Sequence, residues 1–316
     1  MNLNDLINRI GIKPKEKNEA LDTYIENHDK NMAGLETMLS EFSRIINDKS
    51  APKLSRGEDE EDRYDIYYDY IYENLNIDYT LDDIDRFANH PLHYTKNYRD
   101  ENSIKNAELG LFISAAINKV VKKGEKVRIT TLIPLGYLFY RLKDTEAYAN
   151  IAGIYFGLCA QDSKIHAEEA GIYAAYYMRN SELHVKKASH FLGGHADNSK
   201  IYADKASSNA GYDIKNSELH VKETSGRLGV EAINSKIYAD KAGGNVGEGM
   251  KNSELRIYEL DGDLQNIHAI NKTNNIYIGE ASYKRHYIRY KLNGIKVWKK
   301  QKQNVDVFSG DYYGSK

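Results

Sequence analysis

The feature of this sequence that most restricts its fold is a short motif that repeats every 18 residues. Each copy begins with Asp or Asn and continues with alternating polar and apolar residues. The copies are DTEAYA, DSKIHA, NSELHV, NSKIYA, NSELHV, NSKIYA and NSELRI, and they open at Asp144, Asp162, Asn180, Asn198, Asn216, Asn234 and Asn252. Similarity at a fixed period predicts a repeat architecture in which each unit packs on its neighbours.

The residues inside the unit favour a strand over a helix. With the Asp or Asn as position 1, positions 4 and 6 are apolar and positions 3, 5 and 7 carry mostly charged or ring residues, which is typical of a strand with one buried face. Position 14 is Gly or Ala in the units that open at Asp144 to Asn234. Helical repeats need about 33 to 47 residues, and glycine at this position in five of the six units would weaken a helix. The unit therefore predicts one coil of a parallel β-solenoid.

The polar positions predict how successive coils align. Charges alternate in sign from unit to unit at position 3 (Glu146, Lys164, Glu182, Lys200, Glu218, Lys236, Glu254) and at position 7 (Glu168, Lys186, Asp204, Lys222, Asp240). Coils about 4.8 Å apart would stack opposite charges, and a slip by one coil would stack like charges. Asn at position 1 and Ser at position 2 are expected to bond the backbone at a corner and each other along the stack.

We expect an α+β chain with four parts. Residues 1–57 form a helical segment with a long helix at Asn18 to Asn47 and a linker, and residues 58–124 form an acidic, Tyr-rich helical cap. Residues 125–280 form a single-stranded parallel β-solenoid of about eight 18-residue coils, and residues 281–316 form a basic β-hairpin and tail. In the cap, Thr80 should begin a helix. Ile104 to Val121 is either a helix that closes the solenoid or an atypical first coil, and we favour the helix.

One stretch resembles a known family. GGNVGEGMKNSELRIYE (residues 243–259), with its echoes NAGYDIKNSELHV and PLGYLFYRL, is similar to coils of the GXGXG domain. That domain is the right-handed β-helix of the glutamate synthase large subunit and of the formylmethanofuran dehydrogenase C subunit. Only Gly247 and Gly249 reproduce the full glycine pair. In that family the domain is mainly a structural coupler, so the resemblance implies a scaffold over the solenoid region.

The C-terminal part is the best candidate for an interaction surface. Residues 283–302 carry eight bases and no acid, with aromatic residues between them, and Asn293-Gly294 predicts a hairpin turn. The candidate interaction residues are Lys284, Arg285, Arg289, Lys291, Trp298, Lys299 and Lys300. Three roles stay open: binding nucleic acid, protecting a sheet edge, or docking on the acidic block at 58–85, which has twelve acids and one base.

Histidines offer the one metal hypothesis. His166 and His184 occupy position 5 of adjacent coils and are weak candidate metal ligands, although no cluster with zinc-ligand spacing accompanies them. The alternative is a ladder of stacked rings, because Tyr202 and Tyr238 hold the same position further along. The sequence has no P-loop, GxSxG or HExxH motif. We therefore expect no catalytic residues and no cofactor.

Composition narrows the class further. The formal net charge is −2 and there is one cysteine, Cys159, which excludes an internal disulfide framework. No apolar run could span a bilayer and the polar start is unlike a signal peptide, so we expect a cytoplasmic protein without membrane partners. The expected function is a non-enzymatic scaffold or protein-interaction module that binds a protein partner or itself. The alternatives are a nucleic-acid or polyanion binder, and a metal-binding or carbohydrate-active β-helix protein.

Overall fold

The computed structural model describes residues 19–54, 60–76, 78–94, 98, 100, 103–261, 273–281 and 295–297. The N-terminal part holds helices α2 (Glu19–Ile46), α3 (Glu60–Asn74), α4 (Leu81–Ala88) and α6 (Ile104–Val120), with a 3-10 helix η1 (Pro91–Tyr94) between α4 and α6. The strands that follow are β1 (Lys126–Ile129), β2 (Glu146–Ala152), β3 (Lys164–Ala170), β4 (Glu182–Ala188), β5 (Lys200–Ala206), β6 (Glu218–Thr224), β7 (Lys236–Gly243), β8 (Glu254–Asp261), β9 (Asn275–Ala281) and β10 (Ile295–Val297).

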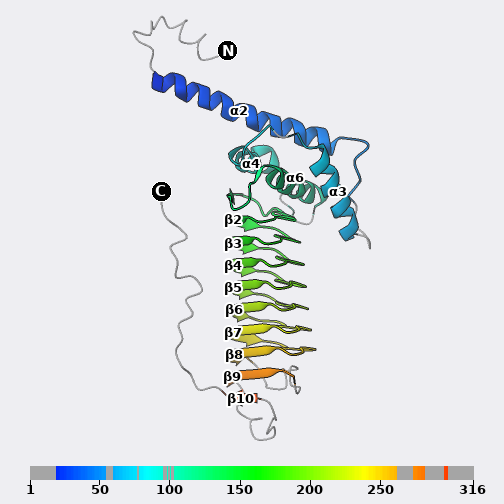
Figure 1. Cartoon of the computed structure of the whole chain (residues 1–316), viewed down its shortest axis with the longest axis vertical. Helices are drawn as coiled ribbons and strands as arrows, with labels where there is room; N and C mark the ends of the chain where they lie inside the picture. The colour runs from blue at the N-terminus through cyan, green and yellow to red at the C-terminus, as the bar shows by residue number, and fades with distance from the viewer. Residues whose placement is uncertain are drawn as a thin grey trace, which may run out of the picture.

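The strands confirm the α+β solenoid. They form one parallel sheet in the order β1 to β10, so each strand pairs with the next one along the chain. Figure 1 shows the coils stacked into a rod with the helices gathered at its N-terminal end. The register is the predicted one, because Lys200 lies opposite Glu182 on one side and Glu218 on the other.

The interior of the rod is a column of small and medium apolar side chains. In each of the strands β3 to β6 the residues at positions 4, 6 and 9 are buried, while those at positions 3, 5 and 7 are intermediate or exposed. At position 4 the column is almost completely dry, since Ile165, Leu183 and Ile201 have 0% exposure. Burial of apolar area along this column is the main driving force for stacking coils.

A ladder of buried serines closes one corner of the rod. The backbone N–H of Ser181 donates to the Oγ of Ser199 in the next coil at 3.2 Å, and the Ser199 hydroxyl donates to the Asp197 carbonyl at 2.8 Å. The same arrangement repeats at Ser163, Ser217, Ser235 and Ser253. After Ser253 the ladder ends on Asn274, whose Oδ1 accepts the Ser253 N–H at 3.0 Å. The predicted serine stacking is thereby confirmed, and it satisfies polar groups that would otherwise be buried unpaired.

The corners also explain the Asp or Asn at position 1. All seven of these residues have positive φ, between 48° and 52°. Asn and Asp tolerate this left-handed conformation better than other residues with a Cβ. Positions 14 and 16 are left-handed as well, with φ of 68° at Gly247 and 71° at Gly249. The conformation persists where position 16 is not glycine, as at Tyr177 and Glu231 with φ of 54° and 59°.

Helix α6 confirms the predicted cap and closes the N-terminal end of the solenoid. One face of this helix, repeating every fourth residue, lies on the first coil: Asn106, Gly110, Ser114 and Asn118. The Asn106 Oδ1 accepts the Gly136 N–H at 2.7 Å, and the Ser114 hydroxyl donates to the Tyr137 carbonyl at 2.8 Å. Side chains thus take over the bonds that another coil would have made.

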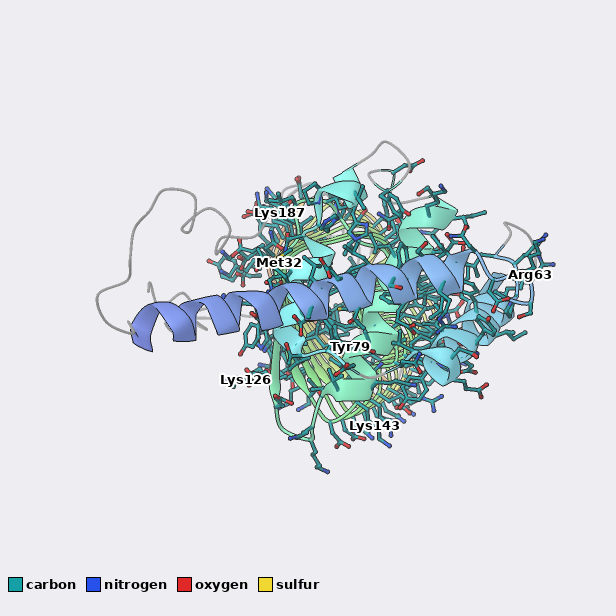
Figure 2. The ribbon with its side chains drawn as sticks, turned by 90° about the horizontal axis from the view of Figure 1, so that it is seen from above. Met32, Arg63, Tyr79, Lys126, Lys143 and Lys187 are labelled. Carbon is teal, nitrogen blue, oxygen red and sulfur yellow. The ribbon has the colours of Figure 1, made fainter. Side chains whose placement is uncertain are left out.

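The other helices pack around α6. Thr80 begins α4 with a capping box shared with Asp83, as predicted for this residue. The Oδ1 of Asp85, also on α4, accepts the Thr130 N–H at 2.6 Å just after β1. Helix α2 confirms the predicted long helix and crosses over the end of the rod, as the view along the axis shows (Figure 2).

The C-terminal end continues the parallel sheet. Strand β9 lies at the end of the region predicted to form the solenoid, residues 125–280. Residues 295–297, expected to be one strand of a hairpin, pair in parallel with β9, with Ile295 opposite Ile276. The turn at Asn293-Gly294 and the other expected hairpin strand lie outside the described residues. The described C-terminal strand is therefore a further rung of the solenoid.

We predict that Ser199→Ala destabilises the fold by about 1 to 3 kcal/mol, because the buried Ser181 N–H loses its acceptor. Ser225→Ala is the control: Ser225 is exposed, its hydroxyl makes no hydrogen bond within the described residues, and its loss should change stability by less than about 0.5 kcal/mol. Urea unfolding followed by circular dichroism measures both. Equal midpoints for the two variants would contradict the role of the serine ladder.

We also predict that Gly110→Ala destabilises the cap. Helix propensity alone would make this change stabilising by about 1 kcal/mol. An added Cβ, however, would overlap the Gly136 carbonyl oxygen of the first coil, so we expect a net loss of about 2 kcal/mol. Lys105→Ala, at an exposed position of the same helix, serves as the control and should be nearly neutral in thermal unfolding. A raised melting temperature for Gly110→Ala would rule out the close contact.

Candidate functional site

A ladder of stacked rings runs along the middle of the main solenoid face. The rings at position 5 are Tyr148, His166, His184, Tyr202, His220 and Tyr238, and neighbouring ring centroids lie 4.5 to 5.0 Å apart. Guanidinium groups cover both ends of this six-ring row: Arg128 lies 5.6 Å from the Tyr148 centroid and Arg256 lies 5.6 Å from the Tyr238 centroid, with Tyr277 of the next coil 4.9 Å away on its other side. Because every ring face is covered by a neighbour or a cation, this ladder offers no open platform for stacking a sugar or a base.

The candidate metal ligands belong to this ladder. His166 and His184 stack with centroids 4.9 Å apart and an interplanar angle of 15°. Zinc–nitrogen bonds of about 2.0 to 2.1 Å require the two nitrogens to converge on one point, whereas rings stacked in parallel direct them side by side. Within the residues that the structure describes, no group of three or more His, Cys, Asp or Glu side chains could hold a metal ion.

Carboxylates at position 3 support the histidine rings. His184 contacts the Glu182 carboxylate through Nε2, and His220 Nε2 lies 2.8 Å from the Glu218 carboxylate. Burial is nevertheless the largest influence at two positions: it lowers the pKa of His166 to about 4 and also lowers the pKa of His184. Both rings are therefore neutral in the folded protein near pH 7.

Charged side chains flank the ladder in the predicted alternation. Lys186 and Glu168 at position 7 form an ion pair at 2.7 Å, and so do Lys222 and Asp204. At position 3, Lys200 is in register with two glutamates but makes no ion pair within the described part of the chain. Exposed pairs of this kind contribute about 0 to 1 kcal/mol each, so their main effect is to set the register.

Position 8 carries a pattern that the sequence reasoning missed. Its residues pair two by two: Glu169 with Lys187 at 2.8 Å, and Lys205 with Glu223 at 3.3 Å. Consequently Lys187 and Lys205 lie directly opposite each other on β4 and β5. The signal for this like-charge neighbour is present in the sequence, where position 8 reads Lys in two successive units.

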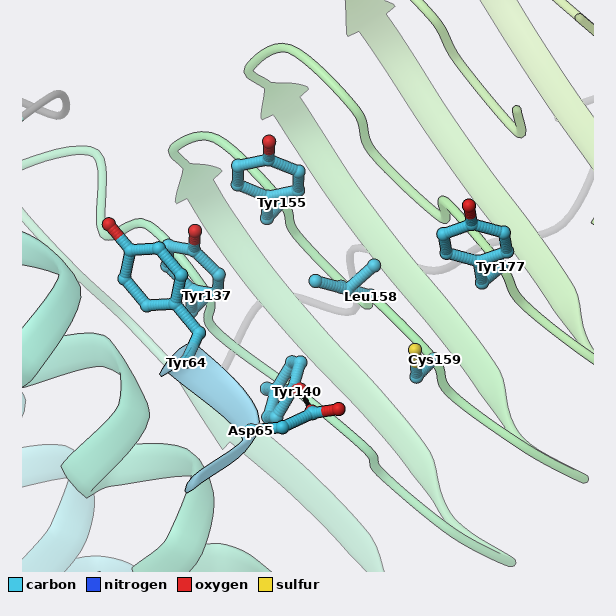
Figure 3. A pocket seen from close by; sticks show the side chains of 8 residues that line it. All are labelled: Tyr64, Asp65, Tyr137, Tyr140, Tyr155, Leu158, Cys159 and Tyr177. Carbon is cyan, nitrogen blue, oxygen red and sulfur yellow. Dashed lines mark hydrogen bonds between the residues drawn. The ribbon is translucent and has the colours of Figure 1, made fainter. Parts of the chain in front are cut away.

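A second aromatic ladder joins the helical cap to the solenoid. Tyr64 of α3 stacks on Tyr137 with centroids 4.5 Å apart, and the stack continues through Tyr155, Tyr173 and Phe191 at 4.8 to 5.0 Å. Figure 3 shows these first three rings in a row, with Tyr177 on the other side of Leu158 and Cys159. The cavity between them has a volume of about 50 Å³, enough for one or two water molecules.

The acidic block finds a basic partner at this junction. The guanidinium of Arg141 lies 2.8 Å from Asp65 and 2.7 Å from Asp69, and its Cζ is 5.5 Å from the Tyr68 centroid. Tyr140 also donates to Asp65. The first coil of the solenoid therefore holds the acidic helix α3. The candidate interaction residues, for which docking on the acidic block was one of three open roles, lie outside the described residues: Lys284, Arg285, Arg289, Lys291, Trp298, Lys299 and Lys300.

Three comparisons with known proteins found no match. No family model, no curated protein and no solved structure matches this chain. The assignment of a parallel β-solenoid is therefore based on the strand order and register of the structure. Among the residues that the structure covers, none of the helices has the length and apolar character needed to cross a membrane.

We predict that stability falls as the pH drops from about 6.5 to about 4, because the unfolded chain takes up protons on His166 and His184 that the folded chain does not. His166→Tyr keeps a stacking ring and removes one such group. The fall in unfolding free energy over this window should then be about 1 to 2 kcal/mol smaller, a value below the full linkage effect because water reaches the ring edge.

Denaturant titrations at pH 7.5 and pH 4.5 measure this difference. Tyr202→Phe is the control, since it alters the same ladder without changing proton uptake in this range and should retain the full pH dependence. An identical pH dependence in His166→Tyr and the unaltered protein would contradict the argument.

Proposed function

We propose that the protein is a non-enzymatic scaffold that holds protein partners or further copies of itself at fixed positions along a rigid rod. The observation that carries this proposal is the way in which the polar face of α6 closes the N-terminal end. Asn118, for example, donates to the Tyr140 carbonyl at 2.9 Å. An end closed by side chains cannot add another coil, so contacts with partners fall on the walls and on the opposite end.

The chemistry of the main face supports the same proposal. Its rings cover one another, and acids such as Glu168 are neutralised by a lysine of the next coil, in this case Lys186 at 2.7 Å; Asp240, whose pKa is raised by burial, makes no ion pair within the described residues. Catalytic groups normally combine an exposed position with a perturbed pKa inside a cleft. On the described part of this face, the histidines whose pKa is lowered are His166 and His184, and both have their ring faces covered by neighbouring rings.

The GXGXG resemblance is kept as part of the proposal. The backbone at positions 14 and 16 is left-handed in coil after coil, with φ of 67° at Gly229 and 59° at Glu231 in one coil. This conformational requirement supports a relationship to GXGXG coils even where the second glycine is replaced. We further propose a cytoplasmic location, because the lone Cys159 suits a reducing compartment.

We predict that the basic C-terminal residues promote self-assembly. Replacing Lys284, Arg285, Arg289, Lys291, Lys299 and Lys300 with Gln should lower the mass measured by light scattering, because the attraction to acidic residues of another copy is lost. Substitution is preferable to deleting residues 283–316, since deletion would remove β10 and expose the edge of β9.

The control variant neutralises six exposed lysines elsewhere: Lys122, Lys123, Lys143, Lys200, Lys236 and Lys251. It should retain the mass of the unaltered protein. A monomeric mass for the unaltered protein, or an equal loss of mass in both variants, would show that the C-terminal bases do not direct assembly.

A further inference from the structure

One corner of the solenoid changes character halfway along the rod. At positions 11 and 12, three successive coils carry bulky residues, Ile154-Tyr155, Ile172-Tyr173 and His190-Phe191. The next three coils carry Ser208-Asn209, Gly226-Arg227 and Gly244-Asn245. An open groove of about 650 Å³ lies along this second half, beside the small residues Ser207, Ser225 and Gly244. The groove is lined mainly by residues at positions 8 to 10, and Gly244 at position 11 also borders it.

The backbone bonding changes at the same place. In the bulky coils the position 12 N–H bonds to the next coil, and the last such bond runs from the Phe191 N–H to the Ser208 carbonyl at 3.1 Å. The corresponding Asn209 N–H has no hydrogen-bond partner in the described chain, whereas its counterpart one coil further on, the Arg227 N–H, donates to the Ser208 Oγ at 3.3 Å. At position 10, the Ser207 N–H donates to the Ala188 carbonyl, but the Ser225 N–H has no partner in the described chain. The corner therefore presents backbone donors where earlier coils satisfy them internally.

Lysines line one rim of this groove. Lys187 and Lys205 face each other across adjacent strands, and Lys241 lies two coils beyond Lys205. Lys187 stands on the outer wall of the rod in the axial view (Figure 2). Lys187 and Lys205 each pair with a glutamate, but their own side chains are 66% and 64% exposed. Such exposed pairs are weak, so a ligand anion can share these ammonium groups at little cost.

The remaining lining groups define the ligand more closely. Glu223 and Asp261 can accept hydrogen bonds, and Ser207, Thr224 and Ser225 can both donate and accept. None of the described residues that line the groove is aromatic, so nucleic-acid bases would find no stacking surface.

We propose that this groove binds an acidic oligosaccharide, with its anionic groups between Lys187 and Lys205 and its hydroxyls on the serine, threonine and carboxylate side chains. The coil spacing of about 4.8 Å sets the lysines in a row along the rod axis, which suits an extended, repeating ligand. The lining residues of this site, at 187–261, are distant in the sequence from the C-terminal bases, and the proposal does not depend on the scaffold function.

Isothermal titration calorimetry on the full chain tests the proposal with three probes: a galacturonate hexamer, a sulfated heparin hexasaccharide and neutral maltohexaose. At about 0.05 M salt we expect at least one acidic probe to bind and the neutral one not to, with weaker binding at about 0.3 M salt. The comparison of the two acidic probes shows whether the groove takes carboxylate or sulfate groups.

Variants locate the site. Lys187→Gln with Lys205→Gln should weaken binding about tenfold, and Ser225→Tyr should block the groove from an exposed position. Lys200→Gln with Lys236→Gln, at the opposite ends of strands β5 and β7 and outside the groove lining, and the variant with six C-terminal bases replaced should both bind normally. Thermal melting confirms that each variant is folded.

Three results would overturn the proposal. They are no binding of either acidic probe at low salt, equal binding of maltohexaose, and binding that is lost only when the C-terminal bases are replaced. The last result would assign polyanion binding to the C-terminal segment in place of the groove.

Discussion

The parallel hydrogen-bond ladder between coils is the constraint on which the rest of the structure depends. Because strands pair in register at 18-residue intervals, each side chain lies beside its counterpart in the next coil, as Ile165 lies beside Leu183. Any property of a position is therefore repeated along the rod. Inside, the result is a dry column and a serine ladder; outside, it is a stack of rings between two rows of alternating charge.

This regularity creates a problem at the ends. A coil without a neighbour leaves a row of backbone donors and acceptors unpaired, which either costs stability or invites another chain to pair. At the N-terminal end, a face of polar and small residues on α6 bonds the backbone groups of the first coil, and Gly110 lets the helix lie directly on that coil. On the outer surface, the Tyr64 ring stacks on Tyr137 and covers the ring face that a further coil would otherwise cover.

The sequence alone was sufficient for the parts of the fold that repeat. The 18-residue period predicted the strands, their register, the serine ladder and the order of charges, because one unit of pattern is tested again in each coil. It could not predict how Arg141 holds Asp65 and Asp69, because those contacts join segments that are distant in the sequence and occur once. The paired charges at position 8 were present in the sequence but were overlooked, since alternation was sought only at positions 3 and 7.

The same reasoning indicates where specificity can reside in a molecule of this kind. Positions 2, 4 and 6 are fixed by stacking, so a substitution there disturbs two neighbouring coils, and these positions vary little along the rod. Positions 11 and 12 lie at a corner where side chains turn outward, and they change from Ile-Tyr to Gly-Arg and Gly-Asn without interrupting the sheet. Departures from the repeat at such corners can alter a surface without altering the fold, which is the freedom that a binding site on a rigid scaffold requires.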